Sequence, residues 1–272
     1  MMNSYGVVGN PVSHSLSPKI HRLFAIETGD DLVYDAIFSP VDKFDETVFN
    51  FREKGGLGLN ITVPFKEQAY FLADAHSNRA SAAGVANLIQ FSDNQIYADN
   101  TDGVGLITDL NDNLGVALQS KRILLLGAGG ASRGVLGPLL HAGPRTVTIA
   151  NRNKIKAEVL AKKNQPGQCV VRGIALTEIE GDEFDIVINA TASSLGGEEL
   201  QIPDGIFSSD SIAYDMMYGP SAQKFLNEAA KKGATKIADG LGMLVEQAAE
   251  SFFIWRGVRP NAFEVIRHLR EG

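Results

Sequence analysis

A short apolar run near the middle of the chain leads directly into a glycine-rich loop. The run 122–127 reads as a buried strand that ends in Gly127, the loop 127–130 contains three glycines, and residues 131–143 read as a helix. The apolar run 146–151 then reads as a second buried strand. Strand, loop, helix and strand in this order predict a βαβ unit with parallel strands.

The same alternation of strands and helices runs through the rest of the chain. Before the loop we expect strands at 5–9, 31–39 and 58–63, and helices at 17–29, 41–55 and 66–80. Ser17 is the expected N-cap of the first helix. Two short strands around Asp93-Asn94 predict a hairpin, and further strands are expected at 184–191, 211–218 and 234–240. A helix from Leu241 ends the pattern, with Gln247 at the edge of its apolar stripe.

This pattern predicts an α/β protein with two domains, each with a mostly parallel sheet. We expect one domain to comprise residues 1–101 plus 240–272 and the other residues 102–239. With 272 residues, 44% apolar and 21% charged, the chain is long enough for two folded domains of ordinary size.

Charge and cysteine content limit the partners. The net charge of −7 argues against a nucleic-acid partner, which usually requires a basic face. A single cysteine, Cys169, excludes an internal disulfide, and the histidines show no metal-ligand spacing, so no metal is expected. Without a signal peptide or membrane span, the sequence predicts a cytoplasmic protein that acts on a small molecule, as a monomer or homodimer.

The glycine-rich loop resembles a dinucleotide-binding fingerprint. Gly127 and Gly129 match its first two glycines, and Ser132 replaces the third. Glycines allow the backbone to approach a pyrophosphate, which the helix N-terminus then binds through its free N–H groups. The alternative is a tight turn whose glycines serve packing alone.

The end of the second strand bears on which cofactor binds. An NAD site usually places a carboxylate there, whereas a 2′-phosphate requires cationic and neutral donors. The chain has Asn151 and Arg152 at this point, followed by Lys154 and Lys156. NADP is therefore favoured, because the arginine fork suits phosphate; the alternative is a solvated basic turn.

The segment Gly130-Ala131-Ser132-Arg133-Gly134 also matches the GxSxG motif of serine hydrolases, which makes a hydrolase a rival interpretation. Ser132, Asp215 or Asp239, and His268 even occur in hydrolase order. Against it, Ser132 is expected inside the first helical turn rather than on the sharp turn at the strand end.

Polar residues gather at the junctions between elements of the first domain. Lys66 stands where a strand gives way to a helix, and Asn87 and Asp102 stand in turns. Singly, each is explained by capping or turn chemistry. Together with Ser15, Ser17, Asn60, Thr62, Asn100 and Thr101 they describe a site for a small polyhydroxylated acid.

The order and spacing of several motifs resemble the shikimate dehydrogenase family over essentially the whole chain. The motifs are GNPVSHSLSP, NITVPFK, ADNTDGVG, LLLGAGGASRGVL, ANR, INAT, YDMMY and ADGLGMLVEQAA. The resemblance implies an N-terminal α/β substrate domain completed by the C-terminal helix, a Rossmann-type NADP-binding domain and an active site in the cleft between them. It also implies reversible NADPH-dependent reduction of 3-dehydroshikimate to shikimate, in aromatic amino acid and chorismate biosynthesis.

By the same resemblance, Lys66 is the general acid/base and Asp102 its partner. The implied substrate-binding residues are Ser15, Ser17, Asn60, Thr62, Asn87, Asp102 and Gln247. The implied cofactor-binding residues are Gly127, Ala128, Gly129, Gly130, Ala131, Ser132, Asn151, Arg152, Lys156, Thr191, Met216 and Gly240.

Two positions depart from the family pattern. Leu88 stands where the family commonly has threonine, and Asn153 replaces the threonine of NRT. An enzyme that also uses quinate or NAD is therefore an alternative, as is a non-catalytic NADP-binding sensor. The retained Lys66 and Asp102 count against the sensor.

Overall fold

The chain divides into two compact units in a computed structural model that describes residues 3–92, 95–165, 167, 169–191 and 200–271. Unit 1 comprises Met1–Gly105 and Leu244–Gly272, and unit 2 comprises Leu106–Met243. The division into domains at 101/102 and 239/240 remains a prediction, as does the cleft between them. In the described part of the chain, no helix is long and apolar enough to cross a membrane.

Unit 1 is built on a six-stranded mixed sheet with the strand order β2-β1-β3-β5-β6-β4. Its strands are β1 Asn3–Gly9, β2 Leu32–Phe38, β3 Gly56–Ile61, β4 Ala75–His76, β5 Leu88–Ser92 and β6 Gln95–Asp99. β1 runs parallel to β2 and β3, whereas β5 is antiparallel to both β3 and β6, as the expected hairpin requires.

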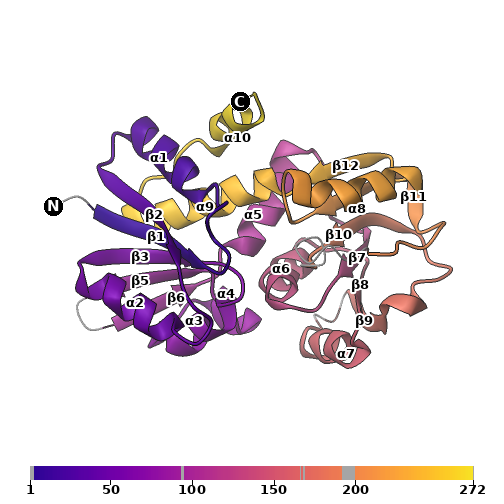
Figure 1. Cartoon of the computed structure of the whole chain (residues 1–272). Helices are drawn as coiled ribbons and strands as arrows, with labels where there is room; N and C mark the ends of the chain where they lie inside the picture. The colour runs from indigo at the N-terminus through magenta and orange to yellow at the C-terminus, as the bar shows by residue number, and fades with distance from the viewer. Residues whose placement is uncertain (1–2, 93–94, 166, 168, 192–199, 272) are drawn as a thin grey trace. The chain divides into compact units, whose positions relative to one another are not determined.

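Helices cover both faces of this sheet (Figure 1). They are α1 Ser17–Thr28, α2 Phe44–Glu53, α3 Lys66–Leu72, α4 Asn78–Ala83 and α10 Ala262–Glu271, together with most of α9 Leu241–Arg256. Val8 and Ile61 pack against α2 and α3 on one side, whereas Tyr5 and Val7 belong to a core cluster with Trp255 of α9. Alternate residues of β1 thus enter different cores, as the two-residue period of a strand dictates.

Unit 2 is built on a second six-stranded sheet, in which every pairing is parallel. The strand order is β12-β11-β10-β7-β8-β9, with β7 Arg122–Leu126, β8 Thr146–Asn151, β9 Val170–Ala175, β10 Phe184–Asn189, β11 Phe207–Asp215 and β12 Lys236–Asp239. This is the order of a Rossmann fold, in which the chain direction across the sheet reverses between the first and fourth strands, here β7 and β10. Ligands bind at such a switch point, beyond the carboxyl ends of the strands.

The helices of unit 2 cover the two faces of its sheet. They are α6 Gly130–His141, α7 Lys154–Lys163 and α8 Pro220–Lys231, with α5 Asp102–Thr108 crossing from unit 1, the π-helical turn η1 Asp109–Asn113 and the short 3₁₀ turn η2 Leu176–Glu178. Ile123 and Leu125 pack with α6 and α7, and Leu124 and Leu126 pack with α8. Burial on both faces explains the unbroken apolar run of β7.

Three local predictions need correction. Residues 66–80 do not form one helix: the backbone N–H of Asp74 donates to the carbonyl of Ile96 in β6, and the Asp74 carboxylate accepts from the Ile96 N–H. Ala75–His76 then forms β4, and Ser77 caps the separate helix α4. Ser17 is the first residue of α1 rather than its N-cap. The strand β9 was not predicted, because Arg172 and Gly173 interrupt its apolar pattern.

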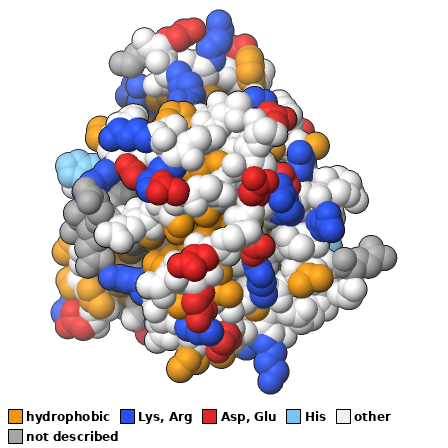
Figure 2. Space-filling model, turned by 90° about the vertical axis from the view of Figure 1, so that its right-hand side faces the viewer, with side chains coloured by type: hydrophobic (Ala, Val, Ile, Leu, Met, Phe, Trp, Pro, Cys, Tyr) orange, Lys and Arg blue, Asp and Glu red, His pale blue; other side chains and the backbone are white. Residues whose placement is uncertain are grey.

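Charged side chains of both signs lie interspersed on the face drawn in Figure 2. Neither Lys and Arg nor Asp and Glu gather there into one large patch. Figure 2 therefore shows a face of mixed charge.

Candidate functional site

The centre of the candidate site in unit 1 is an ion pair between Lys66 and Asp102. Lys66 is the first residue of α3, directly after the connection from β3 that contains the cis Val63-Pro64 peptide, and Asp102 is the first residue of α5. The Lys66 Nζ contacts Asp102 Oδ2, and the two side chains are 16% and 7% exposed. The carboxylate thus fixes the direction of the ammonium, and the Lys66 side chain keeps some exposure to solvent, as a group that exchanges protons with a bound molecule requires.

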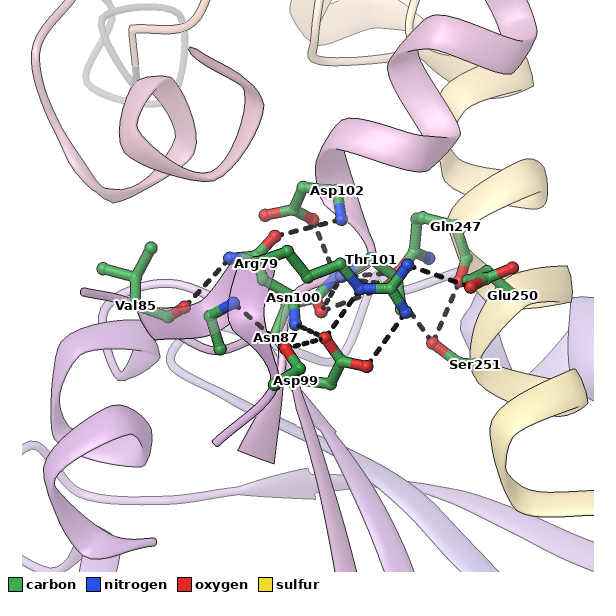
Figure 3. Close-up of polar contacts among 12 residues, drawn as sticks. Arg79, Val85, Asn87, Asp99, Asn100, Thr101, Asp102, Gln247, Glu250 and Ser251 are labelled. Carbon is green, nitrogen blue, oxygen red and sulfur yellow. Dashed lines mark hydrogen bonds and ion pairs between the residues drawn. The ribbon is translucent and has the colours of Figure 1, made fainter. Parts of the chain in front are cut away.

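Asn87 fixes the other oxygen of this carboxylate. Its Nδ2 lies 2.8 Å from Asp102 Oδ1, 2.9 Å from Thr101 Oγ1 and 3.2 Å from Gln247 Oε1. Its Oδ1 accepts a hydrogen bond from the backbone N–H of Thr101 at 2.8 Å. Four predicted site residues, Lys66, Asn87, Asp102 and Gln247, therefore belong to one hydrogen-bonded network. Figure 3 shows Asn87, Asp102 and Gln247 within it.

Asn60 joins this network from β3. Its Nδ2 donates to the carbonyl of Asn87 at 3.2 Å and to Ser251 Oγ at 2.9 Å, and its Oδ1 accepts from the Tyr34 hydroxyl at 2.7 Å. Every polar atom of the Asn60 amide is thus engaged by the protein. Asn60 organises the site from behind, and a direct bond to a ligand would have to replace one of these contacts.

A buried aromatic pair supports Asn60. Burial raises the pKa of Tyr34 well above its ordinary value, and a hydrogen bond with Ser17 opposes this rise. His21 stacks on Tyr34 with ring centroids 4.1 Å apart, and burial lowers the pKa of His21 to about 3. His21 is therefore neutral at physiological pH and acts as a packing ring.

The two serines and Thr62 lie at chain turns beside the same sheet. The backbone N–H of Ser17 donates to Ser15 Oγ at 3.2 Å at the start of α1. Thr62 bonds through its backbone to Val8, and a Cβ added at Gly9 would lie 2.4 Å from the Thr62 methyl group. The ligand contacts implied for these three residues remain predictions.

Leu88, one of the two departures from the family pattern, lies outside this network. Its side chain is fully buried in the core with Tyr5, Val7 and Trp255. The contacts of Asn87 with Asp102 and Gln247 do not involve the Leu88 side chain. The leucine therefore leaves these contacts in place.

Sequence reasoning missed several members of the network. Ser251 was not singled out, although its hydroxyl contacts the Thr101 hydroxyl. Arg79 was placed in the expected helix 66–80 and given no role, yet it bonds Asp99 and Glu250. Ser251 could have been identified from its spacing, because it lies four residues after Gln247 on one helix and so on the same face.

In unit 2, the glycine-rich loop lies between β7 and α6, at the switch point of the sheet. Gly127 has φ +105°, and a Cβ there would lie 3.2 Å from Ala190 O, which follows β10. A Cβ at Gly129 would meet nothing within 4 Å, so this position borders open space in front of α6. Gly127 thus serves packing and conformation, whereas Gly129 leaves room for a ligand at the helix N-terminus.

Ser132 is built into the loop and is not available as a nucleophile. It is fully buried inside the first turn of α6, and its hydroxyl donates to the Gly127 carbonyl at 2.8 Å. His141 is the one histidine in the sequence of unit 2, and its ring contacts Gly137 O. This geometry rules against the serine hydrolase interpretation.

The ends of β10, β11 and β12 lie beside this loop. Asn189 Nδ2 donates to Asp215 Oδ2 at 2.8 Å, and Asn189 Oδ1 accepts from the Thr191 hydroxyl at 2.7 Å. A Cβ at Gly240 would lie 2.4 Å from Met216 O, which explains the glycine by packing. Contact of Thr191, Met216 and Gly240 with a cofactor remains a prediction.

The buried carboxyl group of Asp215 should make the free energy of unfolding depend on pH. Burial raises its pKa from 3.8 to about 6, although Met217 and Asn189 donate to it and oppose the rise. The folded state binds this proton more tightly than the unfolded state. The stabilisation is therefore complete below pH ~4 and is lost as pH rises through about 6, by roughly 3 kcal/mol at most.

The variant Asp215→Asn cannot ionise at this position and serves as the reference. We expect urea denaturation to show that the free energy of unfolding depends on pH differently in the wild type and in this variant. Between pH 4 and 7, the free energy of unfolding of the wild type should fall relative to the variant by up to roughly 3 kcal/mol. A difference that stays constant over this range would contradict the assignment.

The end of β8 presents the residues expected at an adenosine 2′-phosphate. Asn151 Nδ2 donates to the Asn153 carbonyl at 2.9 Å, and Asn153 Oδ1 accepts from the Lys156 backbone N–H at 3.4 Å as the cap of α7. Lys154 pairs with Glu178 at 2.8 Å. The exposed Arg152 directly follows the strand. Asn153 therefore caps α7, a position at which threonine is also favoured.

Comparisons with known proteins agree with a substrate site in unit 1 and a dinucleotide site in unit 2. Three family models match: the shikimate dehydrogenase substrate binding domain over residues 7–89, shikimate/quinate 5-dehydrogenase over 109–196, and the shikimate 5′-dehydrogenase C-terminal domain over 240–269.

Full-length relatives extend the agreement to the whole chain. The shikimate dehydrogenase (NADP(+)) of Nitrosospira multiformis is 51% identical over 99% of this chain and 98% of its own. Among solved structures, an Ael1 enzyme from Pseudomonas putida is 45% identical with a TM-score of 0.90, over 98% of each chain. Shikimate 5-dehydrogenase from Thermus thermophilus, in complex with NADP(H) and shikimate, is 30% identical with a TM-score of 0.87 over 99% of each chain. The chain belongs to the shikimate dehydrogenase family.

Proposed function

We propose that this protein catalyses the reversible reduction of 3-dehydroshikimate to shikimate with NADPH. The observation that carries the proposal is the Lys66–Asp102 pair, held by Asn87 and Gln247 in a chain of this family. A positioned acid beside a cluster of amides suits a ring that carries a carbonyl and several hydroxyls.

The residues of unit 2 fit NADP as the cofactor. Open space at Gly129, the N-terminus of α6 and the absence of a carboxylate from the Asn151-Arg152-Asn153 stretch suit a pyrophosphate and a 2′-phosphate. When bound, the nicotinamide supplies or accepts the hydride.

The residues of unit 1 have three roles in this proposal. Lys66, as an ammonium, donates a proton to the substrate oxygen that becomes the hydroxyl, and takes it back in the reverse direction. Asp102 orients the ammonium and accepts from a substrate hydroxyl. Ser15 and Ser17, at the start of α1, bind the substrate carboxylate, and Asn60, Thr62, Asn87 and Gln247 surround the ring.

The test is steady-state reduction of NADP⁺ by the purified protein with shikimate, beside NAD⁺ and quinate. Turnover with shikimate and NADP⁺ at a kcat/KM far above the other three pairs supports the proposal. Equal turnover with quinate or NAD⁺ would instead favour the broader dehydrogenase, and NADPH binding without turnover of any pair would favour a sensor.

Arg152→Ala tests the cofactor assignment. We expect the KM for NADP⁺ to rise about 10- to 100-fold while the KM for NAD⁺ changes little, because a charge-assisted phosphate contact is lost. Lys154→Ala is the matched control, since Lys154 pairs with Glu178. Equal rises in both KM values for Arg152→Ala would reject the 2′-phosphate role.

The proposal includes a cytoplasmic location and a monomeric or homodimeric state. Cell fractionation and light scattering after size-exclusion chromatography test these two points. A membrane-bound pool or a larger assembly would contradict them.

A further inference from the structure

A buried ion-pair cluster lies beside the proposed substrate site in unit 1. Arg79 Nε and Nη2 lie 2.7 and 2.9 Å from the two oxygens of Asp99, and its Nη1 lies 3.0 Å from Glu250 Oε1. Arg79 comes from α4, Asp99 ends β6, and Glu250 lies in α9. The planar guanidinium therefore holds two carboxylates from distant parts of the chain in one fixed geometry (Figure 3).

The Asp99 end of this cluster leads to Asp102. Asp99 Oδ1 also accepts from the Asn100 backbone N–H at 2.6 Å and from the Ser77 hydroxyl. The Asn100 side chain in turn accepts from the Asp102 backbone N–H at 3.1 Å. These bonds fix the turn between β6 and α5, and thereby the backbone that presents the Asp102 carboxylate.

The Glu250 end leads to Gln247. Residues three apart on a helix share one face, so anchoring Glu250 sets the rotation of α9 at Gln247. Gln247 Oε1 contacts Asn87 Nδ2, and the neighbouring Ser251 contacts Asn60. One arginine thus links the strand that precedes the catalytic carboxylate to the helix that carries Gln247.

We propose that Arg79 is a positioning residue that sets Asp102 and Gln247 at the correct separation for the substrate ring, an inference that rests on the proposed function. Glu250 and Asp99 are 9% and 4% exposed, so loss of the arginine would leave the Asp99 carboxylate buried without its cation and Glu250 paired with Arg259 alone. The turn at Asp102 and the face of α9 would then separate.

Arg259 provides a matched control. It contacts the other oxygen of Glu250, but its side chain is 50% exposed, whereas that of Arg79 is 27% exposed. Arg259→Met therefore removes a positive charge from the same carboxylate and leaves the Asp99–Arg79–Glu250 link in place.

The experiment measures kcat and both KM values for Arg79→Met, Arg79→Lys and Arg259→Met, with shikimate affinity by calorimetry. For Arg79→Met we expect shikimate affinity to fall about tenfold, kcat to fall as well, and the KM for NADP⁺ to stay within about twofold, because misplacement is confined to the substrate site. Arg79→Lys should be intermediate, and Arg259→Met close to the wild type.

Two results would overturn the proposal: unchanged shikimate affinity in Arg79→Met, or a parallel loss of affinity for both substrates, which indicates general loss of structure. If Arg79→Met does not fold, Glu250→Gln tests the α9 end alone. It should weaken shikimate binding about threefold, and unchanged binding would reject the link. A wild type that neither binds nor oxidises shikimate would reject the proposed function instead.

Discussion

Replacing Lys66 with alanine should lower kcat for shikimate oxidation by about 10²- to 10⁴-fold, the usual contribution of a positioned general acid/base. The KM for shikimate should change far less, because Asn87 and Gln247 keep their contacts with each other. Steady-state kinetics of Lys66→Ala in both directions measures this.

Lys54→Ala is the control for Lys66→Ala, since Lys54 is an exposed lysine after α2 in the same unit. Circular dichroism and urea denaturation of both variants separate loss of chemistry from loss of fold. A kcat of Lys66→Ala equal to that of the wild type would remove Lys66 from the mechanism.

Replacing Asp102 with asparagine should lower kcat by about 10²-fold. The substitution keeps the shape of the side chain but removes the charge that holds the Lys66 ammonium. Because the two residues act as one unit, Lys66→Ala/Asp102→Asn should be little slower than the worse single variant.

The kinetic double-mutant cycle compares the loss of kcat in the two single variants with the loss in the double variant. Independent residues would show multiplied losses, which would contradict a shared role for the ion pair. Asp112→Asn, at an exposed aspartate in η1, is the control for the loss of one carboxylate.

Most of the fold could be predicted from the sequence, because buried parallel strands are continuous apolar runs. β7 and β8 are such runs; the boundaries of β8 were predicted correctly, and the predicted end of β7 lay one residue beyond the observed one. β9 failed this criterion because Arg172 donates to Thr148 and a Cβ at Gly173 would lie 2.3 Å from Ala157, requirements that arise only from tertiary contacts. The break within 66–80 likewise depends on pairing with β6.

The candidate site was predictable only in part. Lys66, Asn87 and Asp102 stand in motifs that resemblance could identify, and the structure brings them together. Arg79 and Glu250 could not be identified, because charged residues on helices are usually solvated and no spacing connects positions 171 residues apart. The pairing that joins a half-buried Arg79 to the buried Glu250 is a property of the folded unit.

The most direct test of the central claim is hydride transfer itself. The protein would be incubated with 3-dehydroshikimate and NADPH that carries deuterium at both C4 positions, and the product analysed by mass spectrometry. The account predicts shikimate that contains one transferred deuterium, formed rapidly by the wild type and about 10²- to 10⁴-fold more slowly by Lys66→Ala. Unlabelled product, or no product from a folded protein that binds both compounds, would contradict it.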